Sequence, residues 1–224
     1  MYPLSSRLTA EAFGTFGLIF IGCSSVLVNP LPGASYGLLG IALAHALVLA
    51  IGITATMNIS GGHLNPAVTL GLLAGRKVDG KTAVYYIAAQ LVGAAIAALM
   101  VKGLLPRSLT AGTTLGAPAL APDVSIGQGI AIEAVLTFFL VSAVYGTAVS
   151  ADAPKVGGFG IGLVLLFDIL VGGPLTGAAM NPARAFGPQL ASGRFIAAIV
   201  WWIGPILGGV VAGLLWSMVL LKKK

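Results

Sequence analysis

The chain has 224 residues, of which 58% are hydrophobic and 8% are charged, and its formal net charge is +6. An ordinary soluble domain carries about 25% charged residues, so this chain has too few charges to cover a globule in water. The stretch from Ala12 to Gly75 contains no Asp, Glu, Lys or Arg. This composition excludes a soluble enzyme, and the apolar content excludes a disordered chain.

The few polar groups also limit the possible partners and cofactors. The 12 basic residues are spread over the segments between apolar runs, so they offer no continuous patch to nucleic acid. The two histidines, His45 and His63, have no Cys or carboxylate at metal-ligand spacing, and no phosphate loop or nucleophile–base pair occurs. We therefore expect no nucleic acid, no metal, no cofactor and no enzyme activity.

Six apolar runs are long enough to cross a bilayer, which takes about 20 residues. The segment from Phe195 to Leu221 is uncharged and almost wholly apolar, unlike the alternating strands of a membrane barrel. Helices satisfy their own backbone groups in lipid, so the sequence predicts an all-α membrane protein. The predicted spans are residues 8–28, 37–58, 83–105, 127–149, 157–173 and 195–220.

Two further apolar pieces, residues 65–75 and 181–191, are too short to cross. About ten helical residues reach about 15 Å, or half the hydrocarbon core. A half-span is tolerated only where it is buried in protein or lines a watery cavity. We predict two re-entrant half-helices at these positions.

The half-spans reveal an internal repeat within one transmembrane domain, residues 1–224. One opens with Asn65-Pro66-Ala67 and the other with Asn181-Pro182-Ala183. The predicted repeats, residues 8–105 and 127–220, hold three spans each, an odd number that inverts the second copy relative to the first. The half-helices should then enter from opposite faces.

The distribution of Lys and Arg predicts the orientation. With both termini in the cytoplasm, eight basic residues lie inside and four outside, as the positive-inside rule favours. The plasma or inner membrane is the first expectation for location, and a vacuolar-type membrane is the alternative. The eight inner residues are Arg7, Arg76, Lys77, Lys81, Lys155, Lys222, Lys223 and Lys224.

Each half-span begins with residues suited to a helix start inside a pore. Asn65 and Asn181 suit the N-cap, where the side-chain oxygen accepts a backbone N–H, and the following proline has no N–H to lose. The amide NH2 groups remain free to donate to a solute. The opposed helix N-termini, each with about +0.5 charge, would repel cations at the midplane. The chain before each Asn should expose pore carbonyls, assigned to Gly61, Gly62, His63, Gly177, Ala179 and Met180.

Two intramembrane acids, Glu11 and Glu133, occupy similar places in the two halves. An acid inside the membrane is a functional hypothesis by default, and a proton relay would make the chain a coupled transporter. Their symmetry favours a bracing role, in which each carboxylate accepts hydrogen bonds from the irregular chain before a half-helix.

Over essentially its whole length the sequence resembles the aquaporin or major intrinsic protein family. The segments Ser60-Gly61-Gly62-His63-Leu64-Asn65-Pro66-Ala67-Val68-Thr69 and Asn181-Pro182-Ala183-Arg184-Ala185-Phe186-Gly187-Pro188 carry the resemblance. It implies an hourglass pore in each subunit and a homotetramer in the lipid bilayer.

The resemblance also implies a selectivity filter formed by His45, Ile169, Ala178 and Arg184. Strict water channels usually have an aromatic residue at the first position and His at the second, so this chain looks more like tonoplast-type and ammonia-conducting aquaporins. Glycerol facilitators generally have Asp directly after the pore Arg, where this chain has Ala185.

We therefore predict a passive channel for water and small neutral solutes that excludes protons and ions. Ammonia is the expected second solute, and hydrogen peroxide is a further candidate. The alternatives are a glycerol- or urea-type facilitator, a proton-coupled transporter, and a non-conducting structural membrane protein.

Overall fold

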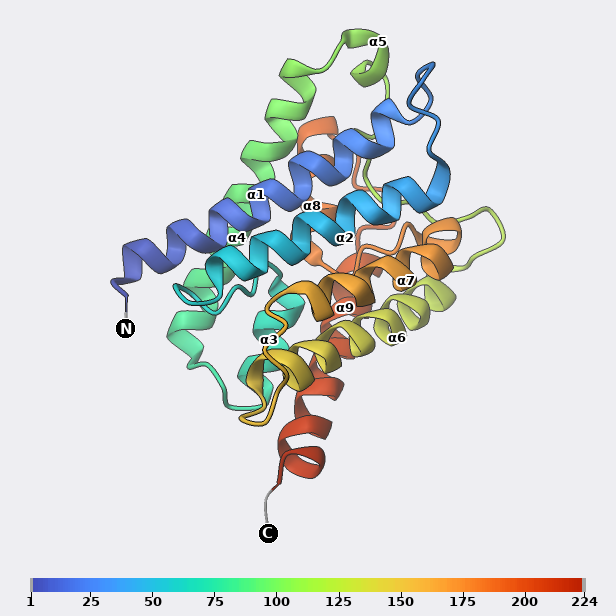
Figure 1. Cartoon of the computed structure of the whole chain (residues 1–224). Coiled ribbons are helices and arrows are strands. Elements are labelled where there is room, and N and C mark those ends of the chain that lie inside the picture. Colours follow the sequence, from blue (N-terminus) through green and yellow to red (C-terminus); the bar gives the residue numbers. More distant parts are fainter. Residues whose placement is uncertain (1, 223–224) are drawn as a thin grey trace.

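The computed structural model describes residues 2–222, so Lys223 and Lys224 of the predicted inner charge cluster lie outside the described residues. All regular structure within 2–222 is helical, which confirms the all-α prediction (Figure 1). In chain order the elements are α1 (Leu4–Val28), α2 (Gly37–Thr56), α3 (Pro66–Ala74), α4 (Gly80–Leu104), α5 (Arg107–Thr110), α6 (Ile126–Val144), the π-helical turn η1 (Tyr145–Val149), α7 (Phe159–Thr176), α8 (Pro182–Ser192), α9 (Val200–Leu215) and the π-helical turn η2 (Trp216–Leu220).

Six helices are long and apolar enough to cross a membrane, and they match the six predicted spans. Four boundaries differ by three to five residues, and two of these are early starts: α1 begins at Leu4 rather than at residue 8, and α4 begins at Gly80 rather than at residue 83. The last span begins at Val200 rather than at residue 195, because residues 196–199 form turns and Ala197 has a left-handed φ of 51°. The fifth span continues through Pro174 to Thr176 and ends at Gly177, whose φ of 79° is typical of a glycine that follows a helix.

The two short apolar segments are helices of 9 and 11 residues, α3 and α8. Both begin at the proline of the Asn-Pro-Ala sequence, and in both the preceding asparagine is the N-cap in extended conformation. Neither helix is long enough to cross a hydrocarbon core of about 30 Å. This confirms the prediction of two half-helices.

Small residues let the long helices cross closely at equivalent places in the two halves. A Cβ atom on Gly93 of α4 would collide with the carbonyl of Ala12 on α1. In the second half, a Cβ atom on Gly208 of α9 would collide with the carbonyl of Ala134 on α6. These glycines bring the backbones of α1 and α4, and of α6 and α9, into direct contact, as is common between membrane helices.

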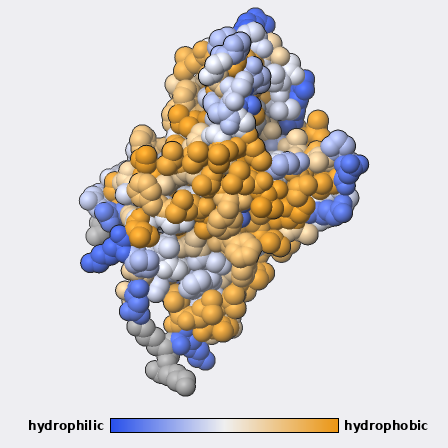
Figure 2. All heavy atoms as spheres, turned by 45° about the vertical axis from the view of Figure 1, so that its right-hand side comes forward, coloured by the Kyte–Doolittle hydropathy of each residue, from blue (hydrophilic) through white to orange (hydrophobic). Residues whose placement is uncertain are grey.

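The outer surface has the polarity expected of a bilayer protein. A broad band of hydrophobic atoms crosses the face shown in Figure 2, with hydrophilic atoms gathered toward the ends. Large apolar side chains such as Ile51 and Leu163 are exposed on the spans. At the start of α4 the exposed Asp79 is the N-cap, and hydrogen bonds from Thr82 lower the pKa of its carboxyl. Charged groups therefore lie at a helix end while the span itself faces lipid.

Candidate pore and selectivity filter

The two half-helices are joined at their N-termini by their asparagines. Asn65 Oδ1 accepts the N–H of Ala67, and Asn181 Oδ1 accepts the N–H of Ala183, at 2.8 and 3.0 Å. The Nδ2 atom of Asn65 donates to the carbonyl of Met180 (2.8 Å), and that of Asn181 donates to the carbonyl of Leu64 (3.0 Å). Each amide NH2 has two N–H groups. The expectation of wholly free amides is thus corrected: one N–H of each amide joins the halves, and within residues 2–222 the other has no hydrogen-bond partner.

The chain leading to each asparagine has the same unusual backbone in both halves. Left-handed φ values occur at equivalent positions, 116 residues apart, in the pairs Gly61 (96°) and Gly177 (79°), Gly62 (63°) and Ala178 (43°), and Leu64 (51°) and Met180 (49°). Such conformations are strained for residues other than glycine and persist only where the surroundings hold them.

Glu11 supplies much of that support in the first half. Its side chain is fully buried on α1. Its Oε1 accepts from Ser60 Oγ (2.6 Å) and the N–H of His63 (3.0 Å), and its Oε2 accepts from the N–H of Leu64 (2.7 Å) and from Gln90 Nε2 (2.8 Å). Both oxygens therefore face donors of the chain that enters α3.

Glu133 has the same arrangement in the second half. It is fully buried on α6. Its Oε1 accepts from Thr176 Oγ1 (2.7 Å) and the N–H of Ala179 (2.9 Å), and its Oε2 accepts from the N–H of Met180 (2.7 Å). The two glutamates thus hold the two strained segments through matching contacts.

A second pair of side chains holds the same segments from α4 and α9. Tyr86 Oη donates to the carbonyl of Ser60 at 2.8 Å. Trp201 Nε1 donates to the carbonyl of Thr176 at 2.9 Å. Each irregular segment is therefore fixed from two helices of its own half.

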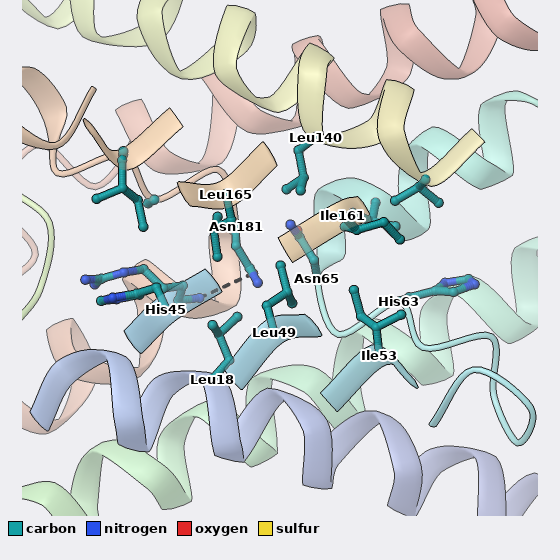
Figure 3. A pocket seen from close by; sticks show the side chains of 16 residues that line it. Leu18, His45, Leu49, Ile53, His63, Asn65, Leu140, Ile161, Leu165 and Asn181 are labelled. Carbon is teal, nitrogen blue, oxygen red and sulfur yellow. Dashed lines mark hydrogen bonds between the residues drawn. The ribbon is translucent and has the colours of Figure 1, made fainter. Parts of the chain in front are cut away.

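A narrow cavity runs past the asparagines. Figure 3 shows Asn65 and Asn181 near its middle, between His45 toward one end and His63 toward the other. The volume open to the centres of water molecules is about 20 Å³. A single water needs about 10–15 Å³ of such volume. The cavity therefore has room for little more than one water molecule. The apolar wall includes Leu18, Leu49, Ile53, Leu140, Ile161 and Leu165.

The structure brings the four predicted filter residues together. His45, Ile169, Ala178 and Arg184 all line the narrow cavity. Three of them, His45, Ile169 and Arg184, also line a wider cavity of about 250 Å³ next to it. The four residues therefore lie where the narrow passage opens into a vestibule.

Contacts behind the filter orient its two polar side chains. Arg184 Nη1 donates to the carbonyl of Gly116 at 2.9 Å, so the loop after α5 fixes the guanidinium. His45 Nδ1 lies 2.9 Å from the carbonyl of Ile41. Because a carbonyl only accepts, Nδ1 carries a proton, and Nε2 of the neutral ring is an acceptor. A Cβ atom on Gly22 would lie 2.5 Å from Nε2, so glycine at this position makes room for the ring.

The predicted pore carbonyls are only partly among the lining residues. His63 and Ala179 line the narrow cavity, and Gly177 lines the vestibule. The described residues that line either cavity do not include Gly61, Gly62 or Met180. The carbonyl of Met180 instead accepts from Asn65, because the left-handed backbone turns it toward the other half.

Some residues at this site act through their backbone and carry little signal in the sequence pattern. The carbonyl of Leu64 accepts from Asn181, and the carbonyl of Gly116 accepts from Arg184. Gly22 has no side chain and so leaves space for the ring of His45. The position of Leu64 directly before Asn65, matching Met180, was the one available signal. Nothing in the sequence marked Gly22 or Gly116 among its 32 glycines.

A bundle of six spans, with two half-helices meeting inside it beside a narrow cavity, defines a transmembrane channel. The sequence model of the family described as "Major intrinsic protein" matches residues 2–216. The chain therefore belongs to the major intrinsic protein family, whose aquaporins are channels for water and small solutes and not enzymes. It is accordingly a multi-pass protein of a lipid bilayer.

Curated relatives and a solved structure agree with this assignment. The chain is 42% identical to "Aquaporin TIP4-4" of Zea mays, over 93% of this chain and 84% of that protein. It is 40% identical to "Probable aquaporin TIP3-2" of Arabidopsis thaliana, over 98% and 86%. It also resembles the X-ray structure of the aquaglyceroporin from Plasmodium falciparum, with a TM-score of 0.85 and 26% identity over 97% of both chains. The similarity to TIP aquaporins supports the tonoplast-type resemblance of the sequence.

Proposed function

We propose that this channel conducts water and ammonia passively, in single file, and excludes protons and other cations. The observation that carries the proposal is the pair of asparagines: each is fixed by a cap and by a contact to the opposite half, and each retains one N–H beside the cavity. A molecule with a lone pair can accept from both amides in turn.

Charge supports the exclusion of cations. The N-termini of α3 and α8 meet at the asparagines, and each helix end carries about +0.5 charge. The Arg184 guanidinium, only 5% exposed, adds a full positive charge at the filter. A cation would meet positive potential at both places with little water to screen it.

The filter composition supports ammonia as a second solute. Ile169 offers an apolar wall where strict water channels usually have a histidine, and Ala178 adds little bulk. Ammonia makes weaker hydrogen bonds than water, so an apolar wall hinders its passage less than it hinders the passage of water. Hydrogen peroxide is a further candidate solute because the small side chain of Ala178 leaves room at the filter.

Flux measurements on proteoliposomes test this proposal. We expect osmotic shrinkage with a low activation energy and a rise of internal pH when ammonia enters. Ile169→His adds a polar group to the filter and should lower the ratio of ammonia to water permeability about tenfold, whereas Ile169→Leu should leave it within about twofold. An unchanged ratio in Ile169→His would refute the assignment of Ile169 to the filter.

A glycerol- or urea-type facilitator is the second candidate, because a solved relative is an aquaglyceroporin. The residue after Arg184 is Ala185 rather than Asp, and the narrow cavity has a volume of only about 20 Å³. We therefore expect glycerol and urea fluxes well below the water flux in the same vesicles. Glycerol flux comparable to that of water would favour the facilitator.

A proton-coupled transporter is disfavoured by the contacts of Glu11 and Glu133. Each carboxylate is fully buried and accepts at least three hydrogen bonds that hold backbone or a neighbouring hydroxyl, which fits the bracing role. Water flux should therefore be independent of an imposed pH gradient.

A non-conducting structural membrane protein is the last alternative. Vesicles that are no more permeable to water than protein-free vesicles would indicate such a protein.

The proposal includes a homotetramer with a pore in each subunit, cytoplasmic termini and inverted repeats at residues 8–105 and 127–220. The Lys and Arg distribution supports the orientation, and the similarity to TIP aquaporins favours a vacuolar-type membrane over the plasma or inner membrane. Native mass spectrometry of the purified protein tests the subunit number. Tag accessibility in sealed cells tests the termini, and imaging of a fluorescent fusion tests the location.

A further inference from the structure

A second cavity, separate from the pore, lies at the end of the bundle where α4 gives way to α5, with α5 at the top of Figure 1. Its volume is about 460 Å³. Its walls come from the last turn of α4, from α5 and the loop that follows, and from the segment after α8. It shares no lining residue with the narrow cavity of the pore.

The cavity is strongly basic. Three cations line it: Lys102, Arg107 and Arg194. None of the lining residues in the described part of the chain is acidic. In a chain with only 12 basic residues, three of them around one cavity make a concentrated positive field.

The hydrogen bonds around the cavity leave most of the cationic donors available. Lys102 Nζ donates to the carbonyl of Ala191 at 2.7 Å, which fixes the ammonium without neutralising it. Within residues 2–222 the guanidinium groups of Arg107 and Arg194 have no hydrogen-bond or ion-pair partner. The hydroxyl of Thr113 donates to the carbonyl of Thr110. The arginines, which can bind two oxygens of one anion at once, are thus the main free donors.

Exposed apolar side chains lie close in sequence to the residues that line the cavity. Leu104, in the last turn of α4, is 64% exposed, and Ile196, two residues after Arg194, is 75% exposed. A spanning helix ends at the level of the headgroups, so cations there meet lipid phosphates while the neighbouring apolar side chains meet acyl chains. This combination suits an amphipathic anion better than a free ion.

We propose that this cavity binds the phosphate group of an anionic phospholipid. Arg107 and Arg194 hold the phosphate oxygens, Lys102 adds charge, and the acyl chains lie along Leu104 and Ile196. The site is independent of the pore chemistry.

Native mass spectrometry of the purified full chain tests the site with phosphatidylglycerol and with phosphatidylcholine of the same acyl chains. We expect tighter binding of phosphatidylglycerol, and a fall of about tenfold in its affinity in the double variant Arg107→Gln/Arg194→Gln, which removes both forked donors. The matched control, Lys81→Gln/Lys155→Gln, removes two exposed cations at the opposite end of the bundle and should stay within about twofold of the parent. Unchanged osmotic water permeability of both double variants checks that they fold.

Three results would overturn the proposal. Equal losses in the two double variants would show general charge attraction rather than a site. Equal binding of the two lipids would show that the anionic charge is not recognised. Inorganic phosphate that displaces phosphatidylglycerol at millimolar concentration, with the same dependence on Arg107 and Arg194, would identify a free anion as the ligand instead of a lipid.

Discussion

The two irregular segments that lead to the half-helices, residues 60–65 and 176–181, differ in sequence but have the same scaffold. Each begins with a hydroxyl residue that donates to a buried glutamate, and each ends with an asparagine that donates to the opposite half. The left-handed residues also occupy matching positions. Two different sequences can therefore build the same support, provided that the groups that hold the backbone are kept.

The two halves differ where side chains face the pore. His63 in the first half corresponds to Ala179 in the second, and Val68 corresponds to Arg184, each pair 116 residues apart. All four line the narrow cavity. The scaffold is symmetric and the lining is not, so we expect selectivity to depend on the positions at which the halves differ.

Removing either buried glutamate should have the largest effect. In Glu11→Leu four donors lose their acceptor, and in Glu133→Leu three do. Each unsatisfied buried donor costs about 1–3 kcal/mol, and the sum approaches the ~5–15 kcal/mol that stabilises a whole domain. Neither variant should accumulate as folded protein, as judged by size-exclusion chromatography in detergent.

Replacement of each glutamate by Gln is a milder test of the same role. Glu11→Gln and Glu133→Gln each keep one acceptor oxygen, so both should fold with a lowered thermal midpoint. Normal yield and melting of either Leu variant would show that its carboxylate does not brace the segment.

Opening the filter should have the next largest effect, and it should act on selectivity rather than folding. The double variant Arg184→Val/His45→Ala removes a full charge and a ring from the narrow cavity. Glycerol and urea permeability should rise at least about tenfold, and some proton leak should appear, because the passage is both wider and less positive. Stopped-flow light scattering and a pH-sensitive dye measure the two effects.

Val68, which corresponds to Arg184 in the other half, provides the control for that variant. Val68→Ala also enlarges the lining, but on the first half and without a change of charge. It should alter solute selectivity less than about twofold. If Val68→Ala and the double variant gave the same selectivity, the filter would not depend on His45 and Arg184.

The spans and half-helices were predictable because they follow from length and apolar content. Six long, largely apolar runs predicted six spans, and the two Asn-Pro-Ala sequences predicted both half-helix starts. The filter positions came from the family resemblance. The start of α9 was placed too early because the turn at residues 196–199 is as apolar as the helix that follows.

Contacts made by the backbone could not be predicted in the same way. The carbonyls of Met180, Leu64 and Gly116 accept from the two pore asparagines and from Arg184. A carbonyl is present at every residue, so no letter of the sequence distinguishes these three. Only the φ angles and the neighbouring helices decide which carbonyl faces which donor.

A smaller effect is expected from filling the space beside His45. In Gly22→Ala the new Cβ atom would lie 2.5 Å from His45 Nε2, so the ring must move within the filter. Water permeability should change several-fold while the protein stays folded, since the displaced group is a side chain and not backbone. Gly17→Ala, on the same helix α1, is the control, because its nearest contact would be an ordinary 3.7 Å from Val48. Equal permeability of the two variants would show that the ring position does not control passage.

We expect the smallest effect from removal of the two equivalent hydroxyls, those of Ser60 and Thr176. This change tests whether the two halves share one scaffold. Ser60 Oγ donates to Glu11 and accepts from the N–H of Gly62, while Thr176 Oγ1 donates to Glu133 and accepts from the N–H of Ala178. Ser60→Ala and Thr176→Val should each lower the free energy of unfolding by about 1–2 kcal/mol, seen as a shift of a few degrees in the thermal midpoint. The loss should be slightly greater for Thr176→Val, because Glu11 keeps three donors after its hydroxyl is removed and Glu133 keeps two. A much greater loss for Ser60→Ala would mean that the first segment depends on its hydroxyl in a way that the second does not, and the two halves would no longer share one scaffold.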